Sequence, residues 1–120
     1  MENQKIVVTT DSREDLKKAE KMKRVMERKN KLDKKFKEKQ EYFDQLDPNA
    51  TIFSNGDYIT ALIGYTDDGR AVYDYDKMIE FLIEFEDMST MEAMEWIDYN
   101  TKRALPYMGE LSPIIVNMIP

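Results

Sequence analysis

Four aspartates gather in one short stretch of the chain: Asp67, Asp68, Asp74 and Asp76. Pairs of carboxylates serve in hydrolysis and in the binding of Mg²⁺. The same residues also fit a simpler pattern, because Asp68-Gly69 is a typical hairpin turn and Asp74 or Asp76 precedes a helical stretch as an N-cap. We therefore interpret these acids as turn, cap and surface residues, and we predict neither a metal site nor a cofactor.

The 120 residues include no histidine and no cysteine. Serine, cysteine and zinc-dependent hydrolysis of the usual kinds need these side chains, so the sequence excludes them. It also contains neither of the glycine-rich motifs that cradle phosphates. A hydrolase that works with carboxylates alone is the remaining enzymatic alternative, and we predict that the protein is not an enzyme.

A second group of polar residues lies among aromatic ones near position 100. Asp98, Tyr99 and Asn100 follow the pair Trp96-Ile97, and Arg103 comes one turn later. Such residues either form a buried hydrogen-bond network or recognise a protein partner, since Trp and Tyr are typical of interface hot spots. The predicted protein-interaction residues are Asp74, Asp76, Trp96, Asp98, Tyr99, Asn100 and Arg103. We also expect substitution of Trp96 or Ile97 to destabilise the core.

The net charge of −6 is unevenly distributed. Residues 1–40 carry 14 Lys/Arg against 8 Asp/Glu, and residues 41–120 carry 4 against 16. The chain thus has a basic arm of net charge +6 and an acidic body of net charge −12. The residues that we expect to contact phosphates or an acidic surface are Lys17, Lys21, Arg24, Arg28, Lys31 and Lys35.

The arm is predicted to be mainly helical. Residues 6–10 are β-branched and favour a short strand, and Asp11-Ser12 then reads as the cap of a helix that runs to about Asp44. Charged residues at two of the eight seam positions make this a poor coiled-coil pattern. The arm is therefore a solvated helix whose last third packs on the body, a helix that pairs with itself or a partner, or a partly disordered segment.

The rest of the chain predicts a compact α+β body. Residues 58–65 and 70–73 form a hairpin, residues 75–87 and 90–104 form two helices, and residues 113–116 form a last short strand. The alternation in the first strand puts Ile59, Ala61, Ile63 and Tyr65 on one face, and Ser89 with Glu92 is a capping box that opens the second helix. The fold class is α+β, with a long N-terminal basic helix followed by a small ββααβ body. We place the domain boundary between residues 47 and 48.

The amino-acid sequence of the body contains motifs that are similar to those of a known group of sequences. The runs TDDGRAVYDYDKMIEFLIE and MSTMEAMEWIDYNTKRALPYMGELSPIIV resemble a family of short hypothetical proteins from phage, prophage and gut-bacterial genomes. The resemblance covers residues 58–117 and not the basic arm. It implies a phage or mobile-element context and carries no known activity.

Together these observations favour a phage-encoded protein-interaction module. We expect it to be a virion or assembly accessory protein, or an inhibitor of a host protein. One alternative is an anti-CRISPR or other DNA mimic that inhibits a host nucleic-acid enzyme, and another is nucleic-acid binding through the basic helix. No apolar run approaches the length of a membrane span, so we expect a location in the host cytoplasm or in the virion.

Overall fold

The structure of the chain is a computed structural model, and it describes residues 2–53 and 57–120. It divides into two compact units, residues 1–31 and residues 32–120. The predicted fold class is confirmed: a long N-terminal helix precedes a hairpin, helices and a final strand in a mixed sheet of three strands. The compact unit begins at Leu32, however, whereas the sequence had suggested a boundary at residue 48.

The first helix, α1 (Glu2–Phe43), is longer than predicted. Residues 6–10 lie inside it, so the short strand predicted there is wrong, as is the helix start at Asp11-Ser12. A lone strand leaves its backbone groups without partners, whereas a helix pairs them internally. The β-branched residues 6–10 lower helix propensity only slightly, and no proline or glycine interrupts residues 2–43.

The last part of α1 belongs to the core of the second unit. Leu32, Phe36 and Phe43 are partly buried against the core, and the rings of Phe36 and Phe43 lie 5.4 Å apart. The Lys39 ammonium donates a hydrogen bond of 2.6 Å to the carbonyl oxygen of Leu62. Burial and neighbouring lysines lower the pKa of Lys39. A charge in the predicted apolar seam is thus accommodated by a backbone carbonyl.

The sheet contains β1 (Leu62–Tyr65), β2 (Ala71–Asp74) and β3 (Ile114–Val116) in that order. The first two strands form the predicted antiparallel hairpin, and β3 pairs with β2 in parallel. A 3-10 turn, η2 (Ile59–Ala61), replaces the first half of the predicted 58–65 strand.

The turn and a bulge after Leu62 shift the side-chain alternation from the predicted one. Ala61 and Leu62 are buried, whereas Ile63 and Tyr65 are exposed.

The hairpin turn needs glycine at position 69. Gly69 has φ 81°, and a Cβ atom there would lie 2.4 Å from the backbone nitrogen of Asp47. The Asp47 amide donates to the Gly69 carbonyl over 3.0 Å. The turn is therefore also the point where the segment after α1 attaches to the hairpin.

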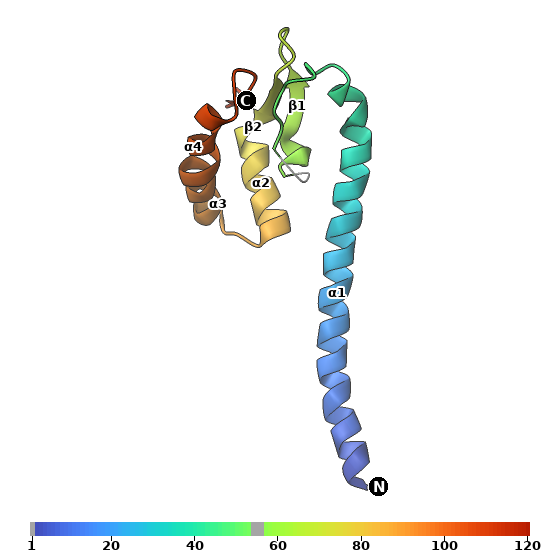
Figure 1. The fold of residues 1–120 in the computed structure, drawn as a ribbon. Helices are drawn as coiled ribbons and strands as arrows, with labels where there is room; N and C mark the ends of the chain where they lie inside the picture. The colour runs from blue at the N-terminus through green and yellow to red at the C-terminus, as the bar shows by residue number, and fades with distance from the viewer. Residues whose placement is uncertain (1, 54–56) are drawn as a thin grey trace. The chain divides into compact units, whose positions relative to one another are not determined.

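Two helical segments pack beside the sheet and against each other (Figure 1). The first, α2 (Tyr75–Glu86), is capped by the Asp74 carboxylate, which accepts from the amides of Asp76 and Lys77. The second begins with a capping box formed by Ser89 and Glu92. Both caps were predicted from the sequence.

The second helical segment changes its winding part-way. It consists of α3 (Thr90–Trp96), a π-helical turn η3 (Ile97–Thr101), α4 (Lys102–Ala104) and a 3-10 turn η4 (Leu105–Tyr107). Its buried side chains are Ala93, Ile97 and Thr101, at steps of four residues. A wider helical turn inserts an extra residue, and such turns are frequent at functional sites. The predicted single helix over 90–104 did not include this change.

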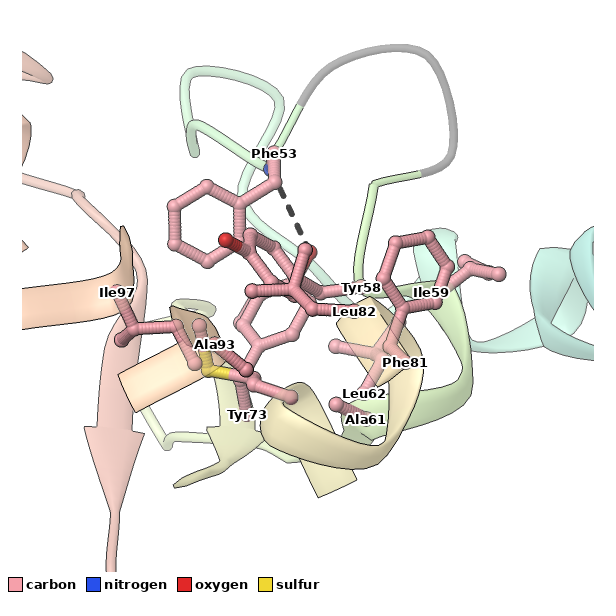
Figure 2. Close-up of a cluster of buried hydrophobic side chains, with 12 residues drawn as sticks. Phe53, Tyr58, Ile59, Ala61, Leu62, Tyr73, Phe81, Leu82, Ala93 and Ile97 are labelled. Atoms are coloured by element: carbon pink, nitrogen blue, oxygen red, sulfur yellow. Dashed lines mark hydrogen bonds between the residues drawn. The ribbon is translucent and has the colours of Figure 1, made fainter. Parts of the chain in front are cut away.

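Aromatic rings from separate parts of the chain meet in the core (Figure 2). Phe53 lies 4.7 Å from Tyr73 and 5.1 Å from Tyr58, and Tyr58 lies 5.4 Å from Phe81 (ring centroids). The Tyr73 hydroxyl accepts from the Phe53 amide, and burial raises the pKa of Tyr73 to about 12. The Tyr58 hydroxyl lies 2.7 Å from the Thr101 hydroxyl. These bonds satisfy the buried polar groups, as packed cores require.

Candidate protein-interaction surface

The aspartates near the hairpin have structural positions. Asp74 is only 7% exposed and its carboxylate caps α2, so it has a structural role, and its contact with a partner stays a prediction. Asp68 accepts a hydrogen bond from the Thr66 hydroxyl within the turn. Asp76 lies exposed in the first turn of α2. Within residues 2–53 and 57–120, no three acidic side chains come together as metal ligands would.

Four predicted interaction residues do share one surface. Trp96 is 47% exposed and Tyr99 60% exposed, and both project outward from the segment whose inner side holds Ile97. Asn100 and Arg103 are exposed as well, and the Arg103 guanidinium lies 5.0 Å from the centre of the Tyr99 ring. The structure thus separates two neighbours that we expected together in the core, because Ile97 is fully buried and Trp96 is not.

Asp98 lies on the flank of the same segment. Its carboxylate pairs with Lys102 at 3.1 Å and accepts from the Tyr75 hydroxyl at 3.4 Å. The Lys102 ammonium also lies 4.6 Å from the centre of the Tyr75 ring. Burial and the Asp98 carboxylate raise the pKa of Tyr75. Asp98 therefore links the start of α2 to α4, and its exposed ion pair contributes little to stability.

Trp96 stands between two hollows in the surface. The first has a volume of about 190 Å³, and the second is a wider hollow of about 320 Å³. Met88 and Trp96 border both hollows, and we call the two hollows together the Trp96 groove. Its first part is lined by Asp57, Tyr58, Phe81, Leu82, Glu86, Met88 and Trp96, and its second part by Met88, Glu92, Glu95, Trp96, Tyr99 and Asn100.

The Trp96 groove has an apolar floor and an acidic rim. Tyr58, Phe81 and Leu82 are buried beneath it, while Asp57, Glu86, Glu92 and Glu95 are exposed around it. The Tyr58 hydroxyl lies 2.7 Å from the Thr101 hydroxyl beneath the groove. Desolvation raises the pKa of Asp57. The groove can therefore bind an apolar or aromatic group while its rim attracts positive charge.

Sequence reasoning identified only part of this groove. It selected Trp96, Tyr99 and Asn100, but not Met88 or the acids at positions 57, 86, 92 and 95. The groove combines residues 57 and 58, the second half of α2 and the segment α3–η3, and their proximity depends on tertiary packing. The spacing of Glu92, Glu95 and Trp96 on one helix face was the one available signal.

The basic residues predicted as phosphate contacts lie on α1. Positions 17, 21, 24, 28 and 31 follow one another at steps of three or four residues, which puts them on one face of the first unit's helix. Arg13 precedes them with the same spacing. Leu16, Met22 and Val25 on this part of α1 are exposed. Lys35 belongs to the second unit, where it pairs with Glu38 at 3.4 Å.

Comparisons with protein-family models, curated proteins and solved structures find no match to this chain. Among the helices in the part of the chain that the structure describes, none combines the length and apolar character of a membrane span. The functional inferences below therefore depend on the geometry of the surface.

Proposed function

We propose that the protein is a non-enzymatic interaction module that binds a protein partner through the Trp96 groove. The observation that carries the proposal is the exposure of Trp96 and Tyr99 side by side on a groove whose floor is apolar. A large aromatic side chain that remains exposed beside a hollow is typical of binding surfaces. The capped and packed elements underneath provide a rigid support for it.

The acidic rim favours a partner with a basic surface. Four carboxylates surround the groove, and the groove lining includes no lysine or arginine among the described residues. A surface of this charge repels nucleic acid and attracts a basic protein. It supports the anti-CRISPR or DNA-mimic alternative equally, because an enzyme that binds nucleic acid also presents a basic face.

The phage setting is the second part of the proposal. Its support is the resemblance of the sequence motifs in residues 58–117 described above, and not the geometry of the surface. In that setting the module is a virion or assembly accessory protein, or an inhibitor of a host protein, and its location is the host cytoplasm or the virion.

The test uses two exposed aromatic residues with nearly equal exposure. Trp96 is 47% exposed on the groove, and Tyr65 is 48% exposed on β1, outside the groove lining. Tagged wild-type protein, Trp96→Ala and Tyr65→Ala are used to capture partners from host and infected cells. We expect one partner to be retained by the wild type and Tyr65→Ala and lost from Trp96→Ala. A partner retained equally by all three proteins would contradict the proposal that binding occurs at the Trp96 groove.

The basic face of α1 favours a second candidate function, nucleic-acid binding. Six cations from Arg13 to Lys31 on one helix face can contact a phosphate backbone, and such binding depends strongly on salt. A matched comparison replaces three lysines on this face (Lys17, Lys21 and Lys31) or three on other faces (Lys18, Lys23 and Lys29) with glutamine. Binding of duplex DNA, followed by fluorescence anisotropy at two salt concentrations, supports the candidate only if the first set weakens it more.

A further inference from the structure

The first part of the Trp96 groove differs from the second in chemistry and shape. Its volume of about 190 Å³ is smaller than the ~300–1,000 Å³ typical of small-molecule sites. It is therefore the size of one side chain rather than of a cofactor. Three aromatic rings line it, with Tyr58 and Phe81 in its buried floor and Trp96 as an exposed wall, and two carboxylates, Asp57 and Glu86, line the same hollow.

We propose that this hollow, the cation pocket, receives an arginine side chain from the basic protein partner; this inference rests on the proposed function. A guanidinium group is planar and weakly hydrated, so it stacks on aromatic rings while its N–H groups bond carboxylates. The cation pocket offers both kinds of contact together. A lysine ammonium is more strongly hydrated and gains less from the aromatic walls.

The walls of the cation pocket are fixed before a partner arrives. Tyr58 is 4% exposed, and its hydroxyl is held by the Thr101 hydroxyl at 2.7 Å. The Tyr58 ring contacts Phe81 in the core. Holding the aromatic walls in place reduces the ordering cost of binding.

The carboxylates give the cation pocket its preference for a cation. Among the residues that the structure describes, no lysine or arginine lines the pocket beside Asp57 or Glu86. Desolvation raises the pKa of Asp57, which indicates that part of its hydration is already lost. An arriving guanidinium compensates for that loss, whereas an apolar side chain would worsen it. Charge complementarity therefore selects arginine over leucine or phenylalanine.

Trp96 provides a direct measurement, because it is the only tryptophan in the chain. Its fluorescence therefore reports on this groove. The probes are capped peptides of six arginines, six lysines or six citrullines, added to the full-length protein. We expect the arginine peptide to change the fluorescence in a saturable manner, more tightly than the lysine peptide, and the citrulline peptide to have no effect.

A matched pair of variants tests the carboxylates. Asp57→Asn with Glu86→Gln removes two charges from the cation pocket, and Asp67→Asn with Glu80→Gln removes two exposed charges elsewhere on the second unit. We expect the first pair to weaken binding of the arginine peptide by about tenfold or more, as loss of charged hydrogen bonds does, and the second pair to weaken it far less. Circular dichroism confirms that both variants are folded.

Four outcomes would overturn the inference. Equal binding of the arginine and lysine peptides would show that binding is unspecific charge attraction. Equal weakening of arginine-peptide binding by the two variants would show the same. If the wild type does not bind the peptides but self-associates, and the pocket variant does not self-associate, then the pocket binds a second copy of this chain. A captured partner whose binding requires Trp96 but is unchanged in the Asp57→Asn, Glu86→Gln variant would support the proposed function. It would contradict the inference that the pocket binds an arginine.

Discussion

Residues 13–31 and residues 32–43 belong to the same helix, but they have different surroundings. Leu16, Met22, Val25 and Met26 in the first stretch are all more than half exposed. Leu32, Phe36 and Phe43 in the second pack against the core of the compact unit. The first stretch is stabilised by local helix propensity, and its charges remain solvated. The second stretch is stabilised in addition by the burial of its apolar side chains. The comparison shows that a change in charge along the chain does not mark the boundary of a folded unit.

Two truncations give the largest expected difference between these stretches. A protein that starts at Leu32 keeps every core contact named above, and we expect cooperative thermal unfolding close to that of the full chain. A protein that starts at Pro48 loses Leu32, Phe36, Phe43 and the Lys39 hydrogen bond. Large buried apolar residues contribute ~2–5 kcal/mol each, and partly buried ones less, against a total stability of ~5–15 kcal/mol.

We therefore expect the shorter protein to lose its cooperative transition in calorimetry. Cooperative unfolding of residues 48–120 with an unchanged Tm would contradict the boundary at Leu32. It would restore the boundary that the charge pattern suggested.

Introducing an aspartate into each unit gives the next largest effect. Ile97 is fully buried, so Ile97→Asp places a charge in the core, and we expect a loss of at least ~3 kcal/mol in the free energy of unfolding. Met26 is 60% exposed, and Met26→Asp is expected to change it by less than ~0.5 kcal/mol. Urea unfolding at neutral pH measures both. A large loss in Met26→Asp would show that residues 13–31 contribute to a packed interface.

Two glycines of the hairpin allow a finer test of how the segment after α1 is attached. Gly69→Ala meets both a positive φ and the Asp47 backbone, so we expect a loss of about 1–3 kcal/mol. An added Cβ at Gly64 meets nothing within 4 Å, and Gly64→Ala is expected to be neutral or slightly stabilising. Equal Tm values for the two variants would contradict the close contact at Asp47.

Patterns of neighbouring residues in the sequence were sufficient to predict much of this fold. The Asp-Gly turn and the Ser89–Glu92 capping box depend on neighbouring residues and were predicted correctly, and the cap of α2 was narrowed to Asp74 or Asp76, of which Asp74 is the one observed. The 3-10 turn at residues 59–61 and the π-helical turn at residues 97–101 depend on packing from distant segments. Because these turns determine which side chains face outward, the sequence misplaced Ile63 and did not separate Trp96 from Ile97.

The candidate surface was predictable to a lesser extent than the fold. Trp96 and Tyr99 stood out by residue type, since exposed aromatic residues in an acidic body suggest recognition. Asp57 and Glu86 did not, because 29 residues separate them in the chain and only the fold brings them to one pocket. Asp74 was selected for its charge, although its capping role buries it.

The smallest expected effect has the opposite sign and concerns Asp57. Desolvation raises its pKa in the folded protein above the ordinary value, so the folded state binds a proton more readily than the unfolded state. By linkage, the ionised carboxylate lowers stability at neutral pH, and this loss disappears as the pH falls through the raised pKa. Asp57→Asn removes the charge, and we expect a small rise in Tm at pH 7 that vanishes at a pH below the ordinary Asp value. Asp76→Asn, at an exposed position in the first turn of α2, is the control and should give no such rise, because a carboxylate there favours the helix dipole.

If Asp57→Asn gains stability and at the same time loses the arginine peptide, then the Asp57 carboxylate serves binding at a cost to the stability of the fold, as residues of binding sites often do. A lower Tm in Asp57→Asn would instead show that the carboxylate supports the turn before β1, and the cation pocket would then lose one of its two charges as an argument.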